Sequence, residues 1–207
     1  MPPPSVTLTP LRASVQLRHG IIHCDLPTDW ALETFPMMQQ CYDAGYVYTN
    51  PDFMWWTEII AAAMGPEMSL RQMPLKTLGE LDIHYGFGTD WPVDPLDPKY
   101  SIWSAMTRET LMGLFGTHPF GTDECIDVHA ALKAATRSNA YLLYMENKIG
   151  SIEVGKYADI AVWDTDWYGA TTDEIKAANC ELTMLGGEVV YMADGTPVTI
   201  APHGKGL

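Results

Sequence analysis

Two side chains that suit metal-dependent chemistry each follow a short apolar segment of the sequence. His23 comes directly after Ile21 and Ile22, and Asp90 comes shortly after the apolar run at residues 83–87. We read both runs as short buried strands. In parallel α/β barrels the reactive groups lie at the carboxyl ends of the strands. The two side chains are therefore expected to meet at one rim of a sheet.

A neutral imidazole and a carboxylate are suitable ligands for a divalent metal such as zinc. An aspartate beside such a metal can also accept a proton from the water that the metal activates. Each residue has a simpler interpretation too. His23 can be a core or rim histidine bonded to a backbone carbonyl, and Asp90 can be a turn residue or a helix cap.

Three further residues are candidates for contact with a substrate, namely Trp91, Trp56 and Arg71. Trp56 lies in a segment rich in tryptophan and methionine, which suits the lining of a substrate pocket. Packing in the hydrophobic core is the alternative for the same segment.

The composition excludes several classes of partner. The chain has 207 residues, and 12 basic against 26 acidic side chains give a formal net charge of −14. This charge argues against nucleic acid and against anionic membrane surfaces as partners. The four cysteines are widely spaced, as expected for buried thiols in a reducing compartment. No run approaches the length of a membrane span, and no signal peptide is evident, so we expect a cytoplasmic protein.

The order of predicted elements divides the chain into three parts. Residues 1–16 look irregular, and residues 17–146 alternate short strands with helices. Residues 147–207 carry a strand at 158–163 and a hairpin of two strands, 180–185 and 188–192, around the glycines at 186 and 187. Strands are expected at 21–22, 46–49 and 83–87, and helices at 32–44, 74–81, 99–112, 122–136, 137–145 and 171–178. Residues 53–64 suit a helix or a long loop. The pattern predicts an α/β fold followed by a small β domain.

Several short motifs resemble one known family, in the same order along the chain. Residues 88–98, GTDWPVDPLDP, resemble the G-S/T-D-x-P-V-x-x-x-D-P signature of the metal-dependent amidohydrolase superfamily, in its amidohydrolase-3 branch. Residues 106–108, 130–140, 149–164 and 185–191 resemble the branch's later motifs. Residues 18–23 are similar to its R-x-x-I-E-H motif, with isoleucine where glutamate is usual.

The resemblance implies a metal-dependent (β/α)₈ hydrolase that acts on carbon–nitrogen bonds other than peptide bonds. Asp90 then ends the last barrel strand, where it binds the metal and shuttles a proton, and His23 is the metal-binding histidine of the sixth strand. The implied cofactor is a divalent metal such as zinc, and the implied substrate is a small amide-type molecule. The implied fold is the last three strands of a TIM-like barrel plus part of a C-terminal β-sandwich.

The same resemblance predicts that much of the family's site lies outside this sequence. Family members carry an H-x-H pair on the first strand and further ligands on the fourth and fifth strands, and none of these motifs is present here. A catalytic zinc needs three protein ligands, and the sequence offers two. We therefore expect a C-terminal fragment or one subunit of a split enzyme, completed by a complementary chain or a homo-oligomer. The alternatives are a non-catalytic remnant that binds a partner chain through an open barrel edge, and a substrate-binding module built on Trp56.

Overall fold

The protein is described by a computed structural model that places residues 18–42, 45–49, 57–109 and 119–197. The predicted irregular segment 1–16 lies outside these ranges. Within them, no helix is both long enough and apolar enough to cross a membrane.

A three-stranded parallel sheet organises the first part of the chain. Its strands are β1 (Gly20–Ile22), β2 (Tyr46–Thr49) and β3 (Tyr85–Phe87), in that spatial order. Parallel neighbours need crossover connections, and helices supply them. The first crossover contains α1 (Asp29–Tyr42), and the second contains α2 (Thr57–Met64), α3 (Pro66–Leu70) and α4 (Leu75–Glu80). The predicted α/β class is confirmed.

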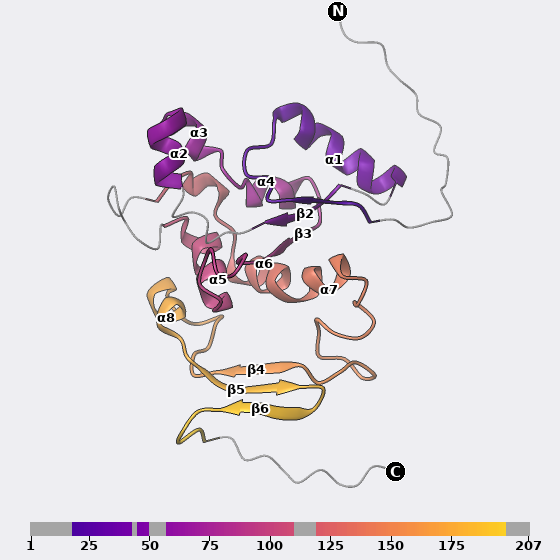
Figure 1. The fold of residues 1–207 in the computed structure, drawn as a ribbon, viewed down its shortest axis with the longest axis vertical. Coiled ribbons are helices and arrows are strands. Elements are labelled where there is room, and N and C mark those ends of the chain that lie inside the picture. The colour runs from indigo at the N-terminus through magenta and orange to yellow at the C-terminus, as the bar shows by residue number, and fades with distance from the viewer. Residues whose placement is uncertain (1–17, 43–44, 50–56, 110–118, 198–207) are drawn as a thin grey trace, which may run out of the picture.

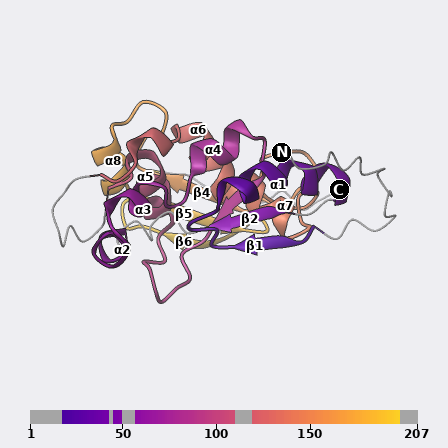
Figure 2. The same cartoon turned by 90° about the horizontal axis from the view of Figure 1, so that it is seen from above.

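The hydrophobic core is built around β2 and β3. Val47 is fully buried, and it clusters with Phe35 of α1, Leu78 of α4 and the aromatic rings of Tyr85 and Phe87. Figure 1 shows this sheet between α1 and α4 on one side and α6 and α7 on the other. Seen from above, β1 lies at the outer edge of the sheet, next to β2 (Figure 2). Burial on both faces fits the short, nearly all-apolar strands that the sequence predicts.

Helical structure follows β3 in two stretches. The first is α5 (Pro98–Thr107), whose start is capped by the Asp97 carboxylate and which ends at Arg108 in a left-handed conformation. The predicted helix 99–112 is therefore too long. The second stretch begins with the 3₁₀ turn η2 (Thr122–Glu124), which extended backbone at Cys125 and Asp127 separates from α6 (Val128–Lys133). The predicted helix 122–136 is therefore interrupted near its start. From α6 the helix continues through the π-helical turn η3 (Ala134–Ser138) into α7 (Asn139–Leu142). The predicted break at residue 137 is wrong, because the π turn carries the helix through it.

An antiparallel sheet closes the described chain. Its strands are β4 (Ile160–Trp163), β5 (Cys180–Leu185) and β6 (Glu188–Met192), with α8 (Thr172–Ala177) between the first two. Both hairpin glycines, Gly186 and Gly187, have positive φ angles, as a tight two-residue turn requires. The hairpin has the predicted bounds.

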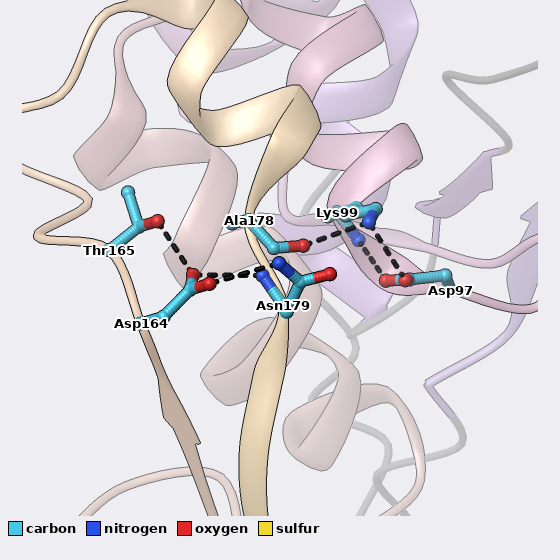
Figure 3. Close-up of polar contacts among 6 residues, drawn as sticks. All are labelled: Asp97, Lys99, Asp164, Thr165, Ala178 and Asn179. Atoms are coloured by element: carbon cyan, nitrogen blue, oxygen red, sulfur yellow. Dashed lines mark hydrogen bonds and ion pairs between the residues drawn. The ribbon is translucent and has the colours of Figure 1, made fainter. Parts of the chain in front are cut away.

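A hydrogen bond and a cation–π contact join α5 to α8 and to the residue that follows α8. The buried Lys99 donates a 2.8 Å hydrogen bond to the carbonyl of Ala178 and lies 3.5 Å from the Asp97 carboxylate (Figure 3). The Lys176 ammonium lies 3.7 Å from the centroid of the buried Trp103 ring. α5, which follows Asp90 in the sequence, therefore contacts the helix that lies between β4 and β5 of the second sheet.

The described strands form two separate three-stranded sheets and no closed barrel. The finer predictions therefore stay predictions: three strands of a TIM-like barrel, part of a β-sandwich, and a boundary at residue 147.

Candidate metal site

The end of β1 turns sharply at the first candidate ligand. His23 and Cys24 both have left-handed backbones, with φ of 67° and 53°. The His23 amide still donates a 2.7 Å bond to the Tyr48 carbonyl of β2, and the Cys24 amide bonds back to Ile22. Non-glycine residues adopt this conformation rarely, and such strain is concentrated at functional sites. The strand therefore ends by presenting the imidazole at its carboxyl edge.

The end of β3 carries the second candidate ligand. The Gly88 amide bonds to the Thr49 carbonyl at 2.9 Å and prolongs the pairing with β2 beyond Phe87. Asp90 then takes up a left-handed φ of 49°, and its carbonyl accepts a hydrogen bond from the Val93 amide. Because β1 and β3 flank β2 in parallel, their carboxyl ends share one edge of the sheet.

The two side chains meet at that edge. His23 Nε2 lies 3.5 Å from Asp90 Oδ2, and the side chains are 39% and 35% exposed. This separation is longer than a normal N–H···O hydrogen bond of about 2.7–3.2 Å. The pair is therefore close and partly open to solvent, without the geometry of a tight direct hydrogen bond.

A third carboxylate belongs to the same electrostatic group. Burial raises the pKa of Asp25 above its ordinary value of 3.8, while the charge on His23 opposes this shift and the charge on Asp90 adds to it. The Oδ1 atom of Asp25 is buried and finds no hydrogen-bond partner among the described residues. Desolvating a carboxylate without a partner is costly, so this atom is suited to a ligand.

The pair has a spacing that a tetrahedral metal would require. Zinc–ligand bonds of about 2.0–2.2 Å at tetrahedral angles place two ligand atoms about 3.4 Å apart. The observed 3.5 Å between His23 and Asp90 fits two corners of such a site. Across the described part of the chain, no group of three or more His, Cys, Asp and Glu side chains has the geometry to hold a metal ion. Within the described residues, His23 and Asp90 therefore form a candidate pair of ligands and not a complete site.

The structure does not bring the other predicted site residues into this pair. Arg71 pairs with Asp29 and lines a cavity of about 590 Å³ whose walls include neither His23 nor Asp90. Trp91 directly follows Asp90 and is exposed. Trp56 lies outside the described residues. The roles of all three in substrate binding stay predictions.

The sequence reasoning missed Asp25. One signal for it was available: an acid two residues beyond a candidate histidine ligand, in the same loop after a strand. That loop also shapes the neighbouring thiol, because burial and, secondarily, the charge of Asp25 raise the pKa of Cys24 to about 11. Cys24 is only half-buried, and it stays a protonated thiol at neutral pH.

Comparisons with known proteins agree on one family. The model of the Amidohydrolase family matches residues 4–191. The N-substituted formamide deformylase of Arthrobacter pascens is 26% identical over 161 residues, which are 76% of this chain and 29% of that protein. A metal-dependent hydrolase of unknown function from Pyrococcus furiosus is 28% identical, with a TM-score of 0.53 over 67% of this chain and 26% of its own.

An adenosine deaminase from Xanthomonas campestris, solved with bound Zn, shares the fold at 19% identity, with a TM-score of 0.56 over 84% of this chain and 38% of its own. The chain spans about a third of the length of the curated relatives it matches. The family match covers most of the sequence and includes both candidate ligands, His23 and Asp90. The chain belongs to the Amidohydrolase family.

Proposed function

We propose that the chain contributes two metal ligands, His23 and Asp90, to a metal-dependent hydrolase of carbon–nitrogen bonds other than peptide bonds. The observation that carries the proposal is the 3.5 Å approach of His23 Nε2 and Asp90 Oδ2 at the carboxyl edge of a parallel sheet. Substrates of such enzymes bind at this edge of α/β folds. Zinc is the proposed ion because its ligand distances match the pair, and a structural relative is solved with bound Zn.

Two residues of this chain have distinct parts in the proposed reaction. A divalent metal, when bound, lowers the pKa of a coordinated water and polarises the substrate carbonyl. Asp90 accepts the proton of the attacking water on its carboxylate and donates it to the leaving nitrogen. His23 holds its Nε2 toward the same point as Asp90 Oδ2, so it fixes where the reaction takes place.

The name of one relative points to an amide-type substrate. The Arthrobacter pascens relative is an N-substituted formamide deformylase, and we extend the class of small amides, not that particular substrate, to this chain. Because the described residues hold no group of three or more His, Cys, Asp and Glu side chains that could bind a metal ion, we propose that other polypeptide completes the site, either in the same protein or in a complementary chain. We therefore expect the 207-residue chain alone to bind zinc weakly and to turn over no amide.

Zinc titration calorimetry on the purified chain tests the proposal. His23→Ala and Asp90→Asn should each abolish the binding isotherm. His129→Ala and Asp82→Asn are matched controls, because both side chains are exposed and Asp82 shares the left-handed backbone of Asp90. The proposal is refuted if His23→Ala and Asp90→Asn bind zinc as the unmodified chain does.

A second candidate function is supported by the open edge of the first sheet. β1 has β2 on one side and no strand on the other within the described residues, and Ile22 at this edge is 68% exposed. An exposed apolar edge strand is suited to pairing with another chain. The corresponding proposal is a partner-binding subunit without catalysis of its own. Zinc binding that is unaffected in His23→Ala, combined with dimerisation that Ile22→Lys abolishes, would favour this candidate.

A further inference from the structure

Arg108 is a buried arginine whose side chain donates hydrogen bonds to three backbone carbonyls of the described residues. It follows α5 with a left-handed φ of 56° and is 1% exposed. Its Nε donates to the Phe120 carbonyl at 2.6 Å, its Nη1 to Met73 at 2.9 Å and its Nη2 to Gln72 at 2.5 Å. A planar guanidinium presents its donors in a fixed fork, so these three carbonyls must keep one mutual arrangement. Charge-assisted bonds of this kind are roughly twice as strong as neutral ones.

One of these contacts reaches the loop that carries the candidate metal ligand. The Gln72 carbonyl and the Met73 amide belong to the same peptide group. Arg108 binds the carbonyl end of this peptide, and the Met73 amide donates a 2.8 Å hydrogen bond to the carbonyl of Asp25. A cation on the carbonyl polarises the peptide and strengthens its N–H as a donor. The Arg108 guanidinium therefore supports the position of Asp25 through one peptide.

The loop between β1 and α1 is held at two points. The His23 amide bonds to the Tyr48 carbonyl at 2.7 Å, and the Asp25 carbonyl is held by Met73. The left-handed residues are His23, at the first of these points, and Cys24, between the two. Such conformations persist only where the surrounding structure supports them. Release of the Asp25 end would let His23 relax away from Asp90.

The space around the guanidinium is closed on the side of residue 121. A Cβ atom at Gly121 would lie 2.2 Å from the Leu70 carbonyl oxygen and 3.2 Å from Arg108 Nη2. Gly121 also has a positive φ of 63°. Only glycine allows this segment to approach the guanidinium so closely. The Arg108 guanidinium is thereby confined between residues 70–73, which follow α3, and residues 120–121, which precede η2.

We propose that Arg108 is a positioning residue: through the Gln72–Met73 peptide it holds the loop that presents His23 to Asp90. The support of the loop at residues 23–25 by Arg108 rests on the hydrogen bonds alone. Its effect on metal binding rests on the proposed function. If Arg108 has only a structural role, its replacement lowers the stability of the whole fold evenly. If Arg108 is a positioning residue, its replacement also loosens the hydrogen bond between the Met73 amide and the Asp25 carbonyl.

Amide exchange measured by NMR on the 207-residue chain separates these two roles. The readout is the exchange rate of the Met73 amide divided by that of the Val47 amide, which is buried in the core and bonded to the His84 carbonyl at 3.0 Å. Arg108→Gln should raise this ratio about tenfold, the equivalent of one lost charge-assisted bond. The matched control is Lys99→Gln, which also removes a buried cation bonded to a backbone carbonyl of a distant segment. The control should leave the ratio unchanged.

The outcomes distinguish this inference from the proposed function. An unchanged ratio in Arg108→Gln overturns the positioning role, even if His23→Ala and Asp90→Asn abolish zinc binding. A raised ratio in Arg108→Gln together with about tenfold weaker zinc binding supports it. Zinc binding that is unchanged in His23→Ala and Asp90→Asn refutes the metal proposal. The exchange result for Arg108→Gln stays valid in that case.

The unmodified chain provides a measurement that does not depend on the folding of any variant. The inference predicts that the Met73 amide of the unmodified chain exchanges as slowly as the Val47 amide. This comparison is used if Arg108→Gln fails to fold. Fast exchange at Met73 overturns the inference.

Discussion

Replacement of Gly86 by alanine is the most sensitive test of how β3 is positioned. A Cβ atom at Gly86 would lie 2.2 Å from Asn139 Oδ1 and 2.9 Å from Leu142 Cδ1, so α7 must give way. The side-chain amide of Asn139 donates a 2.8 Å hydrogen bond from Nδ2 to the Phe87 carbonyl. This bond joins α7 to the end of the strand that leads to Asp90. The alanine methyl group would displace that amide.

The expected size follows from three terms. Overpacking a closed site costs about 1–3 kcal/mol, and the displaced hydrogen bond costs a further 0.5–1.5 kcal/mol or so. Removing a glycine from the unfolded chain returns about 0.4–1 kcal/mol. We therefore expect Gly86→Ala to lower the free energy of unfolding by about 0.5–4 kcal/mol.

Urea unfolding followed by circular dichroism measures the change, and the chain contains a matched control. Gly20 lies in β1, and a Cβ atom there would lie 3.5 Å from the Tyr46 carbonyl oxygen, an ordinary contact. Gly20→Ala should be neutral or slightly stabilising. Gly86→Ala should cost less in an Asn139→Ala background, with a coupling of about 0.5 kcal/mol or more. Equal stability of the two alanine variants would show that α7 does not approach β3 as described.

Two further predictions concern ionic contacts away from the candidate site. Lys99→Met should lower the free energy of unfolding by about 1.5–3 kcal/mol, because a charged donor to the Ala178 carbonyl is lost; chemical denaturation measures this, and a change below 0.5 kcal/mol or so would contradict it. The hydrogen bond from Arg18 lowers the pKa of Glu146 below its ordinary value of 4.5, so the carboxylate stabilises the fold above that pH and loses this effect as the pH falls through its folded pKa. Glu146→Gln should therefore be less stable than the unmodified chain at pH 7 and approach it in acid, and a stability difference that does not depend on pH would contradict the assignment.

The sequence predicts elements well where local chemistry decides them. The hairpin from Cys180 to Met192 has the predicted bounds because two glycines are required by its turn. β2 also has its predicted bounds, since an apolar run follows Gly45 and ends before a polar Asn-Pro-Asp turn. The α/β class follows from the alternation of such runs with helical patterns.

Elements whose ends depend on distant contacts are predicted less well. α5 ends at Arg108, several residues before the predicted end, because this side chain binds carbonyls 35 and 36 residues away in the sequence. The helix that leads to α7 continues through a π turn, and Asn139 there bonds to a strand carbonyl 52 residues away. No pattern within a helical window contains these partners.

The candidate site also contains one part that the local sequence predicts and one part that it does not. Its two proposed ligands follow apolar strands, so the order of strands alone predicts that His23 and Asp90 share one edge. The contribution of Asp25 could not be predicted in the same way, because it depends on the left-handed turn at His23 and Cys24 that returns the chain toward Asp90. Backbone strain of this kind leaves no clear trace in residue type.

The central claim, that His23 and Asp90 bind one metal ion together, is tested most directly with a paramagnetic ion. Cobalt(II) added to the ¹⁵N- and ¹³C-labelled chain should broaden the NMR signals of the His23 imidazole and the Asp90 carboxylate at the same low concentration. Signals of the exposed His129 should stay sharp, and zinc should displace the effect. Broadening at only one of the two residues, or equal broadening at His129, would contradict a shared metal site.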